Sequence, residues 1–253
     1  MRGVASLISV WGSTRLVVMV SVVAAIHAAA LIPFKPIVIL PGVTELRPGM
    51  VFPIVFSLLF GPAAAWGTAI GNTIGDLFGS LGPGTLFGFV GNLLYGYLPW
   101  RIWEAFRQGA PRFKSGGDWI VYILAVVSAS SACALVIGWG IHILGFFPFV
   151  TTSGIILGNN LIVGLVLGPP FLLAIYPRVA RLNLLYTDLA NVERRPSPAS
   201  STLARAAALA GTAAALCGIG AGYLAAVAGG TDAAITAAVT PFVVVVLLAA
   251  ALV

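Results

Sequence analysis

Apolar residues gather along this chain in long runs, which polar residues interrupt at only a few places. Eight runs can be marked. They cover residues 16–32, 50–60, 62–78, 85–100, 119–144, 150–176, 203–228 and 233–253. Because a helix of about 20 apolar residues spans the hydrocarbon core of a bilayer, the pattern predicts an all-α membrane protein with about eight transmembrane spans.

The composition agrees with this interpretation and excludes a soluble enzyme. Hydrophobic residues make up 60% of the chain and charged residues only 8%, whereas soluble domains carry about 25% charged residues. The two cysteines, Cys133 and Cys217, both stand inside apolar runs with no CxxC pair. Neither a disulfide nor a zinc site is therefore expected.

The second run is short and ends at Gly61-Pro62, so it forms either a tight helical hairpin with the third run or one broken helix. Basic loops favour the hairpin, because positively charged loops tend to stay in the cytoplasm. With a hairpin and a cytoplasmic N-terminus, only Lys35 and Arg47 of the 13 basic residues lie outside. A single crossing would place both large basic loops outside. We therefore expect both termini in the cytoplasm of a multi-pass cell-membrane protein.

A stretch rich in Ser and Pro near residue 200 divides the chain. We expect a six-helix membrane substrate-binding core over 1–180, a cytoplasmic linker over 181–202 and an accessory transmembrane hairpin over 203–253. An alternative concerns the N-terminus, where the apolar run and the Ala28-x-Ala30 spacing are also typical of a cleavable signal peptide.

No phosphate-binding loop, HExxH zinc pair or GxSxG nucleophile motif is present, so we expect no catalysis, no metal and no cofactor. Polar side chains at membrane depth are the remaining indication of a functional site, because burying them is costly unless they are paired or face a cavity. With both termini in the cytoplasm, these polar side chains gather in the outer half of the membrane. The candidate substrate-binding residues are Glu45, Arg47, Asn72, Asp76, Asn92, His142, Asn159 and Asn160.

Structural interpretations of the same residues stay open. The asparagines could join helices by hydrogen bonds, a common use of amides in membrane bundles. His142 could be an interfacial residue beside Trp139, and Glu45 could pair with Arg47.

Small residues mark two helix faces. Gly67, Gly71, Gly75 and Gly79 recur every fourth residue and predict a close contact, most simply with the fourth run. Ala24, Ala25, Ala28 and Ala29 form two overlapping AxxxA registers in the first run, which predict a helix contact without naming its partner.

Four features of the sequence together resemble a known family. They are a six-helix core with its termini inside, the alanine face, the external loop over 31–49, and the segment from Arg47-Pro48 to Gly75-Asp76. The family is that of the substrate-binding S components of energy-coupling factor (ECF) transporters, and the resemblance covers roughly residues 12–180. It implies that Ala24, Ala25, Ala28 and Ala29 dock on a transmembrane scaffold subunit joined to two cytoplasmic ATPases. The C-terminal pair of runs lies outside this six-helix core.

Our first hypothesis is therefore an ECF-type subunit that binds a vitamin or a related small heterocycle. Asp76 and Glu45 would contact a cationic or donor group, the asparagines amide-like edges, and Trp66 or Tyr95 could stack on the ring. Two alternatives are a stand-alone secondary transporter or channel for a small polar solute, and a structural assembly protein of the membrane.

Overall fold

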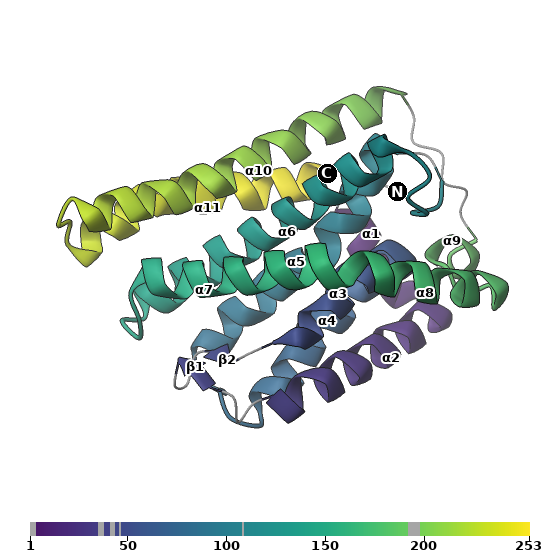
Figure 1. Cartoon of the computed structure of the whole chain (residues 1–253), viewed down its shortest axis with the longest axis horizontal. Coiled ribbons are helices and arrows are strands. Elements are labelled where there is room, and N and C mark those ends of the chain that lie inside the picture. The colour runs from purple at the N-terminus through teal and green to yellow at the C-terminus, as the bar shows by residue number, and fades with distance from the viewer. Residues whose placement is uncertain (1–3, 35–37, 41–43, 46, 108, 192–197) are drawn as a thin grey trace.

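The computed structural model describes residues 4–34, 38–40, 44–45, 47–107, 109–191 and 198–253 (Figure 1). It is a bundle of helices with one short β-ribbon, in which β1 (Val38–Leu40) pairs antiparallel with β2 (Thr44–Glu45). The helices are α1 (Val4–Ser9), α2 (Thr14–Leu31), α3 (Val51–Phe60), α4 (Pro62–Asp76), α5 (Gly84–Phe106), α6 (Gly116–Ile143), α7 (Phe149–Ile162), α8 (Gly168–Arg181), α9 (Tyr186–Leu189), α10 (Pro198–Val227) and α11 (Asp232–Leu252). Each of the eight apolar runs forms one or two of these helices.

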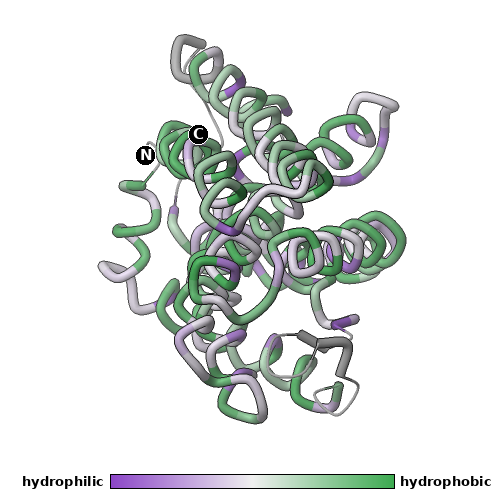
Figure 2. Tube along the Cα trace, turned by 90° about the vertical axis from the view of Figure 1, so that its left-hand side faces the viewer, coloured by the Kyte–Doolittle hydropathy of each residue, from purple (hydrophilic) through white to green (hydrophobic). Residues whose placement is uncertain are grey.

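Five helical segments are long and apolar enough to cross a membrane. They are Thr14–Phe34, Gly116–Ile143, Phe149–Leu189, Thr202–Val227 and Asp232–Leu252. Each of these segments carries exposed large hydrophobic residues, and much of the backbone trace is hydrophobic (Figure 2), as expected where lipid replaces water. The all-α membrane class is confirmed.

The break at Gly61 produces a hairpin and not a bent helix. Gly61 adopts φ +55, and Pro62 begins the next helix. Gly61 lies against Trp100 and Tyr186, whereas Arg47, just before α3, reaches Asn72 in α4. The two helices therefore run antiparallel, and α3 is only 10 residues long, about 15 Å.

The glycine face of α4 packs on a different helix from the one expected. A Cβ at Gly67 would lie 2.5 Å from Val23 Cβ, and one at Gly71 would lie 2.8 Å from the carbonyl oxygen of Ala24. Both glycines therefore let α4 approach α2, so the prediction that they face the fourth run was wrong for this pair. α4 instead approaches α5 at Gly96 of α5, which lies against Thr68 and Ala65 of α4.

The C-terminal helices α10 and α11 form a hairpin against α6 and α7 (Figure 1). Trp139 Nε1 donates to Thr240 Oγ1 over 3.0 Å, and the Tyr223 hydroxyl donates to the carbonyl oxygen of Val150 over 2.9 Å. Within the expected linker, α9 places Tyr186 on Trp100, with 5.1 Å between ring centroids. Residues 192–197 of that linker lie outside the described part of the chain.

The two ends of the bundle differ in their residues. At one end Arg101 donates to the backbone oxygen of Val253, and Arg205 Nε donates to the carbonyl oxygen of Ala105 over 2.6 Å. The basic segments and the start of α10 therefore meet there. The β-ribbon, the α4–α5 turn and the α10–α11 turn lie at the opposite end (Figure 1).

Candidate substrate-binding cavity

A cavity of about 400 Å³ opens at the end of the bundle that carries the β-ribbon. Four helices contribute residues to its wall, mostly at a spacing of four, which places them on one face of each helix. α4 and the turn after it contribute Asn72, Asp76 and Ser80; α5 contributes Gly84, Gly88 and Asn92; α6 contributes Cys133, Ile137 and Ile141; and α7 contributes Ile156, Asn159 and Asn160. Arg47 and Met50 from the segment before α3, and Phe146 and Phe147 from the α6–α7 turn, also line it.

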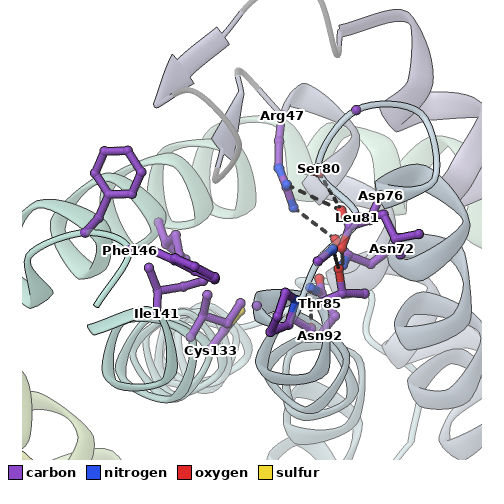
Figure 3. A pocket seen from close by; sticks show the side chains of 18 of the residues that line it. Arg47, Asn72, Asp76, Ser80, Leu81, Thr85, Asn92, Cys133, Ile141 and Phe146 are labelled. Atoms are coloured by element: carbon purple, nitrogen blue, oxygen red, sulfur yellow. Dashed lines mark hydrogen bonds and ion pairs between the residues drawn. The ribbon is translucent and has the colours of Figure 1, made fainter. Parts of the chain in front are cut away.

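Arg47 extends over one side of the mouth toward α4 (Figure 3). Its Nη1 donates to Asn72 Oδ1 over 2.9 Å, and its Nη2 lies 4.0 Å from Asp76 Oδ1. Arg47 directly precedes Pro48, the first residue of a 3-10 turn. A residue before proline is disfavoured in the α-helical region, and Arg47, with φ −124 and ψ 68, lies outside that region.

Asp76 is buried and its oxygens are already ordered by α4 and the turn after it. Asn72 Nδ2 donates to Oδ2 over 3.2 Å, and Ser80 Oγ donates to Oδ1 over 3.0 Å. Since Asn72 donates to Asp76, its own Oδ1 faces the mouth and accepts from Arg47. Gly88 of α5 leaves room for this pair, because a Cβ there would lie 3.2 Å from Asn72 Nδ2.

Two further amides line the cavity, Asn92 from α5 and Asn160 from α7. Asn92 Nδ2 donates to the Gly88 carbonyl oxygen over 2.8 Å. Among the described residues, however, Asn92 Oδ1 and Asn160 Nδ2 have no hydrogen-bond partner, although both residues are nearly fully buried. An unpaired buried amide atom costs about 1–3 kcal/mol. Two residues of the cavity wall therefore carry an acceptor and a donor that have no partner among the described residues.

A π-helical turn, Val163–Leu167, begins three residues after Asn160. Two buried tyrosines donate to carbonyl oxygens at this turn: Tyr95 to Asn160 over 3.3 Å and Tyr122 to Gly164 over 2.6 Å. Asn159 Nδ2 donates to the Arg47 carbonyl oxygen over 3.4 Å and to Asn160 Oδ1 over 3.3 Å. Asn159 thus links α7 to the segment that carries Arg47.

Six of the eight expected site residues meet at this cavity: Arg47, Asn72, Asp76, Asn92, Asn159 and Asn160. His142 does not line it, since its Nε2 lies 3.3 Å from the Asp232 carbonyl oxygen on the side of the C-terminal hairpin. Glu45 stands in β2, and its side chain lies outside the described residues. Among the described His, Cys, Asp and Glu residues, no group of three could hold a metal ion.

Other lining residues were not predicted from the sequence. Ser80 continues the Asn72–Asp76 spacing by one further turn, and this signal could have identified it. The aromatic residues at the cavity are Phe146 and Phe147, not Trp66 or Tyr95. Trp66 instead donates to the Leu7 carbonyl oxygen over 3.0 Å and packs against Trp11.

The four alanines of α2 divide into two pairs. Ala24 and Ala28 are buried within the bundle, and the Ala24 backbone is in close contact with Gly71 of α4. Ala25 and Ala29 are exposed, next to the exposed Val18, Val22 and Ile26. Only Ala25 and Ala29 are therefore free to face another protein or lipid in this conformation.

Comparison with known proteins gives one family. The sequence model of the QueT transporter family matches residues 17–177, from α2 into α8. The match includes every residue of the cavity wall and ends before α10. The comparisons with curated proteins and with solved structures give no match.

Proposed function

Because the chain belongs to the QueT transporter family, whose members are substrate-binding S components of ECF transporters, we propose that it captures a queuosine precursor or a related vitamin-like heterocycle. Capture takes place at the outer face of the cell membrane. A scaffold subunit and ATPases then drive delivery of the substrate inward.

The cavity is the observation that carries this proposal. Its volume of about 400 Å³ lies at the lower end of the range for small-molecule sites and suits a compact ring system. Apolar residues such as Ile137, Ile141 and Phe146 can cover the faces of the ring. Polar atoms of the cavity wall can meet the edges of the ring at only a few points. This favours binding of a specific ligand over passage of many different solutes.

The amides supply the recognition chemistry. Each amide offers one donor and one acceptor group, so Asn92 and Asn160 match a ring edge that presents an N–H beside a C=O or an imine nitrogen. Asp76 and Asn72 match a cationic or hydrogen-donating substituent, because both present acceptor oxygens toward the mouth. Arg47 and Asn159 close the mouth from the two sides.

Orientation follows from the charges. The basic segments that contain Arg101, Arg107 and Arg205 meet at the end of the bundle opposite the cavity. Positively charged loops tend to remain in the cytoplasm, which supports an arrangement with the cavity mouth outside and both termini inside. In this arrangement α3 and α4 form a pair of crossings, and the number of spans is even.

The exposed side of α2 is the proposed docking surface for the scaffold subunit. Ala25 and Ala29 are one turn apart and are flanked by Val22 and Ile26. Small residues at this spacing let a second helix approach closely within a membrane. Ala24 and Ala28 are already used for the contact of α2 with α4.

Mass spectrometry of the molecule released from the purified, denatured protein tests the proposal. We expect a nitrogen heterocycle with a lactam-type or amidine-type edge, retained by His142→Gln and lost from Asn160→Leu. Uptake in cells should require the scaffold and the ATPases. A purified protein without any bound metabolite, together with gradient-driven flux in liposomes that contain this chain alone, would favour the secondary-transporter alternative.

A further inference from the structure

The cavity contains its own cation. Among the described residues that line it, Arg47 is the one cation and Asp76 the one carboxylate. We propose that Asn72 and Asp76 form a subsite for the ammonium or amidinium group of a ligand, and that Arg47 competes with the ligand for this subsite. This inference rests on the proposed function, and it assigns Arg47 a selective role in place of a direct binding role.

The subsite has the chemistry of a cation receptor. Asp76 is 6% exposed and Asn72 is 2% exposed, and a carboxylate that is so buried is costly unless a cation or several donors accompany it. Asn72 Nδ2 and Ser80 Oγ each donate to one oxygen of Asp76. These two contacts orient the carboxylate and leave Asn72 Oδ1 facing the mouth, where it accepts from a cationic group over 2.9 Å.

Arg47 can leave the subsite without a rearrangement of the backbone. Its carbonyl oxygen is held separately, because it accepts from Met50 N over 3.1 Å and from Asn159 Nδ2 over 3.4 Å. The guanidinium stands at the end of a long side chain with several rotatable bonds. Rotation of this side chain removes the guanidinium from Asn72 and Asp76, while the 3-10 turn stays in place.

The position of Arg47 therefore sets the charge of the site. With the guanidinium beside Asp76, the charges of the described lining residues cancel, and this part of the wall suits a neutral ring. A cationic ligand must first displace the guanidinium from its hydrogen bond to Asn72. Arg47 thus lowers the affinity for cations relative to neutral molecules of the same shape, which is the opposite of what a ligand-holding residue does.

The experiment uses the full chain in detergent and methylguanidinium as the probe, at millimolar concentrations far below those that denature proteins. The thermal unfolding midpoint is followed as a function of probe concentration. We expect Arg47→Ala to bind the probe about tenfold more tightly than the wild type, as loss of a competing charge-assisted hydrogen bond predicts. Arg47→Gln, which retains more of the side-chain volume, should behave in the same way and serves if Arg47→Ala does not fold.

Two controls locate the effect. In Arg47→Ala combined with Asp76→Asn, the gain should disappear, and Arg47→Lys should resemble the wild type because the lysine ammonium refills the subsite. Tetramethylammonium, which has the same charge but no N–H donor, should stabilise none of these proteins.

Equal stabilisation of the wild type and Arg47→Ala, or a gain that survives Asp76→Asn, would overturn the inference. A result that contradicts the competition by Arg47 can be distinguished from one that contradicts the proposed function. The metabolite carried by the purified wild-type protein decides the function, whereas the response to methylguanidinium decides the competition at Asp76.

Discussion

The hydroxyl of Tyr95 donates to the backbone oxygen of Asn160, with 3.3 Å between the two oxygens. Tyr95 is fully buried on α5, and Asn160 is the last cavity residue before the π-helical turn of Val163–Leu167. π-helical turns leave the regular helical hydrogen-bond pattern and occur often at functional sites. The contact therefore connects the irregular backbone of this segment to the placement of a cavity amide.

We predict that Tyr95→Phe weakens ligand binding about tenfold while lowering stability by only about 1 kcal/mol, the usual contribution of one hydrogen bond. The phenyl ring keeps the packing, but the Asn160 backbone loses its donor. Tyr223→Phe is the matched control, because it removes a similar bond from Tyr223 to the Val150 carbonyl oxygen, outside the cavity wall. Isothermal titration with the co-purified ligand should show unchanged affinity for the control. Equal losses in both variants would argue against a positioning role for Tyr95.

Close packing of α2 on α4 gives a stability prediction. Gly67→Ala would place a Cβ 2.5 Å from Val23 Cβ and 2.9 Å from the Val20 carbonyl oxygen, so the helices must separate at a cost of about 1–3 kcal/mol. A Cβ at Gly158 meets nothing within 4 Å, so Gly158→Ala should be neutral or slightly stabilising, as alanine favours helix. Thermal unfolding in detergent measures both. A Gly67→Ala protein as stable as the wild type would contradict the close contact.

The exposed face of α2 gives an assembly prediction. Ala25→Leu together with Ala29→Leu should abolish co-purification with the scaffold and the ATPases, because leucine prevents the close approach of a second helix. Ligand binding to the isolated chain should not change, since neither residue lines the cavity. Ala210→Leu, on an exposed position of α10, is the control and should leave the complex intact. Assembly that tolerates the α2 double variant would place the docking surface elsewhere.

The helices were largely predictable because their limits depend on local chemistry. Apolar runs continue until a glycine or proline ends them, and Gly61-Pro62 both ended α3 and began α4. The orientation of each helix about its own axis is a tertiary property, and a single sequence specifies it less directly. Gly67 and Gly71 were assigned to the wrong neighbour because a bare face indicates a close contact but does not identify the helix that makes it.

His142 illustrates the same limit at the site. It stands at the depth expected of a cavity residue, but successive residues of a helix differ in direction by about 100°. Cys133, Ile137 and Ile141 follow one face of α6 into the cavity, so the next residue, His142, points toward Asp232 in α11. The asparagines of α4, α5 and α7 were identified because polarity at membrane depth is itself a signal.

The direction in which the cavity opens is tested most directly by cysteine labelling in intact cells. Cys133 and Cys217 are first replaced by alanine, and single cysteines are then introduced at Gly82, in the turn at the cavity mouth, or at Gly116, at the basic end. Both positions are exposed, and a Cβ at either meets nothing within 4 Å. A membrane-impermeant maleimide should label Gly82→Cys in intact cells and Gly116→Cys only after permeabilisation. The reverse pattern would place the cavity mouth in the cytoplasm and contradict capture from outside.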